Sequence, residues 1–133
     1  MEDKKISTTK IQSFTDLIVW QEGHTLVLLI YKSTKEFPPR EIYALTDQMR
    51  RAVSSITSNI AEGFGRQGYK EKLQFYYVAQ GSLTELKNQL MIAKDVGYLK
   101  KKDYEMLLEQ ANHTHRLLQG LISKTKQFLH SSS

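Results

Sequence analysis

Apolar residues recur at every third or fourth position along most of the chain, which is the spacing of one face of an α-helix. The expected helices begin near Ser13 or Thr15, at about Arg40 or Glu41, near Tyr69 and near Lys101. Pro38 and Pro39 close the first helix, and the others end at about Glu62, Val96 and Leu129. No segment alternates as a half-buried strand does. Four amphipathic helices with short connections predict an all-α fold, an antiparallel up-down-up-down four-helix bundle in a single domain.

The two ends of the chain lack this periodicity. We expect residues 1–12 to form a flexible N-terminal tail, residues 13–129 the bundle and residues 130–133 a disordered C-terminal tail. With 133 residues, 40% of them apolar, the chain suits one domain that buries roughly two-thirds of its unfolded surface. Tyr31, Tyr76 and Tyr77 fall on the predicted apolar faces, so we expect them to be packed.

No targeting or membrane signal is visible in the sequence. The start, MEDKKISTTKIQ, is charged and polar where a secretory signal is apolar. The longest strongly apolar run, at residues 26–31, is far short of the ~20 residues that span a bilayer. The chain has no cysteine, so it has neither a disulfide nor a thiolate metal site. We expect a cytoplasmic protein that binds no membrane.

Residues 61–70, AEGFGRQGYK, contain glycines with the spacing G-x-G-x-x-G, which seats dinucleotide pyrophosphates in βαβ units. The preceding residues are helical by pattern and no strand is predicted on either side. We therefore interpret the stretch as the hinge between two helices. Gly63 should stop the second helix in a left-handed conformation, Gly65 should give the loop freedom, and Gly68 should lie beside the next N-terminus.

Two polar stripes follow neighbouring predicted helices. One consists of Gln48, Arg51, Ser55, Asn59 and Glu62, and the other of Ser82, Glu85 and Gln89. Their spacing places each set on one helix face. We expect a buried hydrogen-bond network that fixes helix register, in which Arg50 or Arg51 neutralises one of the two glutamates.

The alternative for Glu62 and Glu85 is an acid–base or metal pair. Bundle di-metal sites use Glu-x-x-His, and neither glutamate has a histidine three residues later. His113 and His115 are two residues apart on a helix and therefore diverge. We predict no catalytic, metal-binding or cofactor-binding residue, no cofactor, no small-molecule substrate and no enzymatic activity.

Nineteen Lys and Arg residues against fourteen Asp and Glu give a net charge of +5, which favours polyanionic partners. The candidate nucleic-acid-binding residues are Arg50, Arg51, Arg66, Lys70, Lys72, Lys100, Lys101 and Lys102. Three of these crowd the start of the third helix, where free N–H groups favour anions. Phe75 lies near them as a ring on which a base could stack. The alternative is ordinary, solvated surface charge.

Six consecutive apolar residues at 26–31 point in every direction around the first helix. A helix that is apolar on all sides must be buried on all sides, and one core cannot cover it. The sequence therefore predicts a partner surface, occupied by a copy of the same chain or, as the alternative, by a different protein. The candidate interface residues are Leu26, Leu28, Leu29 and Ile30.

Several stretches resemble a known family. The most specific are Trp20 with Tyr31, the Phe37–Pro38 break, LTDQMRRAVSSITSNIAEG at 45–63 and AQGSLTEL at 79–86. From about Phe14 to Leu99 the chain resembles the bacterial four-helix-bundle family of proteins encoded in intervening sequences of 23S rRNA genes. Residues 100–129 are assigned by periodicity alone.

This resemblance implies a homopentameric ring of bundles with no known enzymatic activity. The family is related to accessory proteins of diversity-generating retroelements, which resemble basic pentamers that hold a reverse transcriptase and nucleic acid. We therefore predict a homo-oligomeric module, pentameric by resemblance, that binds RNA, DNA or a nucleoprotein. The alternative is a protein–protein scaffold with no nucleic-acid role.

Overall fold

The computed structural model describes residues 10–131, and every regular element within them is helical. The long helices are α1 (Ile18–Thr34), α2 (Leu45–Phe64), α3 (Tyr69–Asp95) and α4 (Lys101–Ser131). Two short 3-10 helices, η2 (Phe14–Asp16) and η3 (Pro39–Glu41), precede α1 and α2. The predicted all-α class is confirmed. Of the two predicted tails, residues 1–9 and 132–133 lie outside the described residues, and residues 130–131 continue α4 rather than forming a disordered end.

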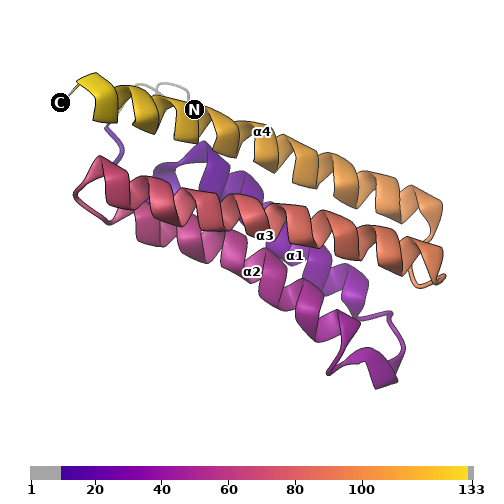
Figure 1. Cartoon of the computed structure of the whole chain (residues 1–133). Coiled ribbons are helices and arrows are strands. Elements are labelled where there is room, and N and C mark those ends of the chain that lie inside the picture. The colour runs from indigo at the N-terminus through magenta and orange to yellow at the C-terminus, as the bar shows by residue number, and fades with distance from the viewer. Residues whose placement is uncertain (1–9, 132–133) are drawn as a thin grey trace.

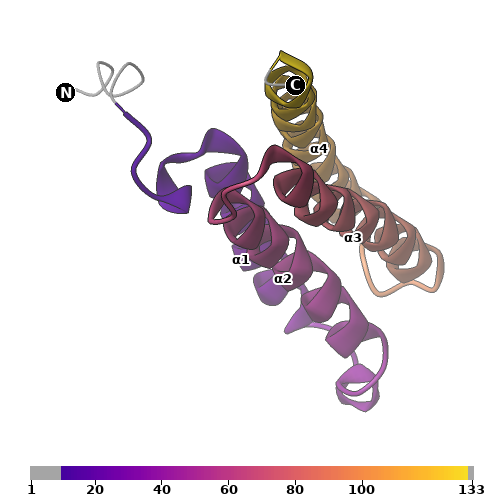
Figure 2. The same ribbon diagram turned by 60° about the vertical axis from the view of Figure 1, so that its left-hand side comes forward.

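The four helices pack as an up-and-down bundle (Figures 1 and 2). α1 and α3 each pack against both α2 and α4, and the described residues show no close backbone approach across either diagonal. Consecutive helices run in opposite directions. The α2–α3 turn and the end of α4 therefore lie at one end of the bundle, and residues 35–44 lie with the α3–α4 turn at the other (Figure 1).

The core consists of the apolar stripes that the periodicity predicts. Fully buried side chains include Leu26, Ile30, Met49, Val53, Ile56, Ile60, Leu83, Leu86, Leu90, Leu107 and Leu118. Tyr76 is buried as expected, but Tyr31 and Tyr77 are 40% and 43% exposed. Each of these two lies at the edge of its stripe, where a cation covers the ring. The Arg50 guanidinium is 4.7 Å from the Tyr31 ring centroid, and the Lys126 ammonium is 5.7 Å from that of Tyr77.

α1 begins later than expected because Ser13 caps a separate short turn. Ser13 Oγ accepts the N–H of Thr15 at 3.2 Å, and the N–H of Ser13 donates to Asp16 Oδ2 at 3.0 Å. This reciprocal capping box encloses η2. Leu17 is then extended, with φ −77° and ψ 128°, so α1 starts at Ile18.

α2 also begins later, at Leu45 rather than at Arg40 or Glu41, because residues 39–41 form η3. The Glu41 carboxylate accepts the Tyr98 hydroxyl at 2.7 Å and the Leu45 N–H at 3.2 Å. These two hydrogen bonds, first that from Tyr98, hold the pKa of Glu41 below its usual value. The Phe37 and Tyr98 rings also pack, with centroids 5.4 Å apart. The 35–44 loop is therefore fixed to the α3–α4 turn.

Gly63 lies inside α2 at a place where a side chain would not fit. An added Cβ would lie 2.6 Å from Tyr76 Cε1 and 3.0 Å from Phe75 Cβ. α2 continues to Phe64, and among the described residues only Gly97 has a positive φ, of 92°. The predicted left-handed stop at Gly63 is therefore wrong. Gly63 instead permits the close approach of α2 to α3, and the G-x-G-x-x-G spacing joins two helices.

The substitution Gly63→Ala should lower the free energy of unfolding by about 1–3 kcal/mol, because the new methyl group would clash with the buried Tyr76 ring. Gly65→Ala is the matched control. Gly65 has right-handed backbone angles, and the nearest atom to its added Cβ is a carbonyl oxygen at an ordinary 3.6 Å. Urea unfolding of both variants measures the difference, and equal midpoints would contradict the steric role of Gly63.

Candidate interaction surfaces

A groove runs between α1 and α4. Two hollows of about 320 and 290 Å³ open along it, and Leu29 and Met106 line both. The first is completed by Glu109, Gln110, His113 and Arg116, and the second by Lys32, Ser33, Glu36, Tyr98, Leu99 and Asp103. The groove therefore has an apolar middle with polar and charged walls.

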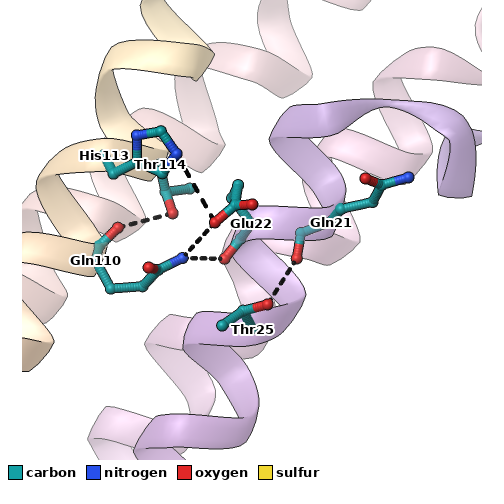
Figure 3. Close-up of polar contacts among 6 residues, drawn as sticks. All are labelled: Gln21, Glu22, Thr25, Gln110, His113 and Thr114. Atoms are coloured by element: carbon teal, nitrogen blue, oxygen red, sulfur yellow. Dashed lines mark hydrogen bonds and ion pairs between the residues drawn. The ribbon is translucent and has the colours of Figure 1, made fainter. Parts of the chain in front are cut away.

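A polar bridge ties α4 to α1 beside this groove (Figure 3). Gln110 Nε2 donates to the backbone oxygen of Glu22 at 3.0 Å and to its carboxylate Oε1 at 2.9 Å. His113 Nε2 lies 3.8 Å from the same carboxylate oxygen. The Thr114 hydroxyl donates to the Gln110 carbonyl at 3.0 Å, within α4. No sequence pattern indicated this bridge, because its partners are 88 residues apart and belong to neither predicted stripe.

Of the four predicted oligomer-interface residues, two lie in the core of the bundle and two lie at or near its surface. Leu26 and Ile30 are fully buried in the core of the single chain, so their assignment to an interface is wrong. They are buried because α2 and α4 both pack against α1 and together cover a wide face of it. Leu29 is half-buried and lines the groove, while Leu28 is 58% exposed on the outer side of α1.

The predicted basic residues do not form one surface. Arg66, Lys70 and Lys72 lie at the α2–α3 turn, and residues 100–102 lie at the α3–α4 turn. The 27 residues of α3 separate these two groups, which is about 40 Å of helix. A single ligand that contacts both groups would have to extend along the whole bundle.

Two cations at the α2–α3 turn have structural partners. Lys72 Nζ donates to the Phe64 carbonyl at 2.7 Å and so caps the C-terminus of α2. Burial lowers the pKa of Lys72. Arg66 forms an ion pair with Glu62 at 2.7 Å, and its guanidinium lies 4.7 Å from the Phe75 ring centroid. Phe75 is therefore covered by Arg66 and is not an open stacking surface.

The two arginines of α2 do not neutralise a glutamate of the polar stripes. Arg51 pairs with Asp47 at 2.9 Å, four residues earlier in the same helix. Arg50 donates to the Thr34 hydroxyl at 2.9 Å and covers Tyr31. The expected partners were wrong because Arg51 reaches a carboxylate one helical turn away in its own helix, whereas Arg50 points toward α1.

The two polar stripes meet at one point only. The Ser82 hydroxyl donates to Ser55 Oγ at 2.8 Å, and Asn59 Nδ2 donates to the same oxygen at 3.0 Å. Gln89 Nε2 donates to Glu85 Oε2 at 3.4 Å, while Gln89 Oε1 is buried without a partner among the described residues. The remaining members, Gln48, Arg51 and Glu62, are exposed. The stripes thus contain a short register-setting contact rather than one buried network.

Glu62 and Glu85 are too far apart to act as a pair. Ser55 faces Ser82 in antiparallel helices, so Glu85 lies opposite Ala52. Glu62 is therefore displaced from Glu85 by about 15 Å along the helix axis. In residues 10–131, no three His, Asp or Glu side chains lie close enough to share a metal ion. None of the described helices combines the length and apolar character of a membrane span.

Residues 15–120 match the family described as 23S rRNA-intervening sequence protein. The chain belongs to this family. The match includes most of α4, which periodicity alone had assigned. The chain is similar to a solved structure from Bacteroides thetaiotaomicron VPI-5482, which is a protein with unknown function from the S23 ribosomal protein family. The TM-score is 0.71 and the sequence identity is 19%, and the match covers 79% of this chain and 98% of that chain. This likeness shows a shared fold, and no curated protein matches the chain.

In this member of the 23S rRNA-intervening sequence protein family, a histidine–lysine contact joins α3 to α4. Lys87 Nζ lies 2.7 Å from His115 Nδ1, an arrangement in which the ammonium donates to a neutral imidazole. Burial, and then the charge of Lys87, lower the pKa of His115 below its ordinary value. Acid therefore adds a second positive charge to a contact that needs the ring neutral.

The free energy of unfolding should consequently fall as the pH drops below about 6.5, because the unfolded chain binds the His115 proton more tightly than the folded chain does. Thermal unfolding at pH 7.5 and pH 5 measures this loss. His115→Asn keeps an acceptor for Lys87 but cannot titrate, so it should lose less stability than the wild type between these pH values. An identical loss in both proteins would contradict the role of His115.

Proposed function

We propose that this protein is a non-enzymatic helical module that assembles with copies of itself and binds nucleic acid or a nucleoprotein. The observation that supports assembly is the open apolar surface along α1 and α4. Met106 is 44% exposed and lines the groove with the half-buried Leu29, and Leu28, the preceding residue of α1, is 58% exposed on its outer side. A copy of the same chain covers these side chains most simply, since one self-complementary patch then satisfies both molecules.

The arrangement of the acidic side chains supports a binding role rather than catalysis. Glu62, the acid–base candidate of α2, is engaged by Arg66 and lies far from Glu85. Glu22, beside the groove, accepts hydrogen bonds from Gln110 at its backbone oxygen and at its carboxylate and so joins two helices. These carboxylates therefore serve the packing and termination of helices.

Assembly predicts a particle heavier than the 15.4 kDa chain, and the family resemblance suggests five copies. Light scattering coupled to gel filtration measures the mass directly. The double substitution Leu28→Lys with Met106→Lys should reduce it, because two charges would be buried in the interface. Val78→Lys, an equally exposed site on α3, is the control and should leave the mass unchanged. A monomer at micromolar concentration would contradict self-assembly.

The observation that supports nucleic-acid binding is the set of free lysines at the α3–α4 turn. Lys100 and Lys102 are exposed and form no ion pair with a described residue. Lys101 approaches Glu105 only at 3.8 Å, with side chains 82% and 61% exposed, so that pair is weak. These ammonium groups are available to phosphates, unlike Lys72 at the opposite end.

Binding of a labelled single-stranded RNA should weaken steeply as salt rises, because phosphate contacts release counterions. Replacing Lys100, Lys101 and Lys102 with Gln should make the slope of log affinity against log salt shallower by up to about 2. Fluorescence anisotropy across a salt series provides both numbers. Absence of binding at low salt would exclude the nucleic-acid role. Partners that persist in a nuclease-treated pull-down would then favour the alternative, a protein scaffold.

A further inference from the structure

One side chain of the 35–44 loop is exposed without a partner. Tyr43 is 92% exposed. The other strongly exposed aromatic side chains each have a ring partner: Arg50 covers Tyr31, Lys126 approaches Tyr77, and Tyr69 stacks on Phe128. Within residues 10–131, Tyr43 makes no ring or cation contact. Its ring therefore contributes nothing to the packing of the single chain.

Tyr43 is nevertheless presented from a fixed position. The loop is anchored through Glu41, which accepts the Tyr98 hydroxyl at 2.7 Å, and through Phe37, which is 5% exposed and packs on the Tyr98 ring. These contacts join the loop to the turn that precedes α4. The backbone that carries the ring is anchored in this way, so the loop loses little conformational freedom on binding a ligand.

The same end of the bundle carries several exposed cations. Tyr98 is followed directly by Leu99 and residues 100–102, whose three lysines are exposed. Arg40, on the loop itself, is also exposed, and its charge lies close to the Tyr98 hydroxyl and the Glu41 carboxylate. Acidic side chains also lie at this end, where one is engaged by a hydrogen bond and two line the adjoining hollow. Glu41 accepts from Tyr98, and Glu36 and Asp103 line the hollow on the groove side. An open aromatic ring and exposed ammonium groups at the same end of the bundle suit a ligand with a flat π-face and a chain of phosphates.

We propose that this end of the bundle, formed by Arg40, Tyr43 and residues 100–102, binds single-stranded nucleic acid, with a base stacked on Tyr43 and phosphates on the cations. This assignment rests on the proposed nucleic-acid role and adds the site and the strandedness. A single strand fits because only an unpaired base exposes its face to a protein ring. In a duplex the bases are already stacked, and only the phosphate contacts remain.

The test uses the full-length protein and a short labelled oligouridylate, with Tyr43→Ala and Tyr43→Phe variants. Tyr43→Ala should weaken binding by at least about fivefold at every salt concentration, because a stacked base is lost. The salt slope should not change, since no charge is removed. Tyr43→Phe keeps the ring and should retain wild-type affinity. Because the side chain is so exposed, neither variant should alter the helical circular dichroism spectrum.

Two controls distinguish base stacking on Tyr43 from a general dependence of binding on exposed rings or on phosphate contacts. Tyr77→Ala removes an exposed ring from α3, away from the loop, and should leave the affinity unchanged. A duplex of the same length should lose little affinity from Tyr43→Ala. Salt-sensitive binding that is indifferent to Tyr43→Ala would overturn the site and leave the proposed function standing. No binding to either oligonucleotide at low salt would overturn both.

Discussion

The close packing of α2 against α3 is the constraint on which the rest of the bundle depends. Gly63 brings the α2 backbone against the buried Tyr76 ring, where an added Cβ would lie 2.6 Å from the ring. The Ser82–Ser55 hydrogen bond of 2.8 Å fixes the register of the same two helices. Once the register of α2 and α3 is fixed, α1 packs on α2, α4 packs on α3, and α1 and α4 pack on each other. The positions of the groove and of both turns follow from that register.

The two hollows of the surface lie on the side of the bundle where α1 meets α4. α1 and α4 are held by the Gln110–Glu22 bridge, and the two hollows lie along the rest of their contact. Leu29 and Met106 line both hollows, so the seam between these helices is only partly filled by the chain itself. This seam is therefore the face of the bundle on which the proposed self-assembly would cover apolar side chains.

The fold was predictable because the spacing of core residues is a local property of each helix. The first residues of the helices were harder to predict. Ile42 and Tyr43 look like the first apolar positions of the second helix, but η3 and the contacts of Glu41 keep them in a loop. The candidate sites depend on contacts between distant residues. The partner of Tyr98 lies 57 residues away, and no periodicity shows that Tyr43 is left outside the core.

The two helix junctions of α3 explain why similar lysines have different roles. At the end of α3, the N–H of Tyr98 bonds to the Ala93 carbonyl at 2.8 Å and that of Gly97 to the Lys94 carbonyl at 3.0 Å. This is a complete Schellman closure, made possible by the positive φ of Gly97. α2 ends without a left-handed glycine, so its Phe64 carbonyl takes the Lys72 ammonium instead. The carbonyl at the end of α2 therefore binds a lysine, whereas the end of α3 is closed by its own backbone and requires none.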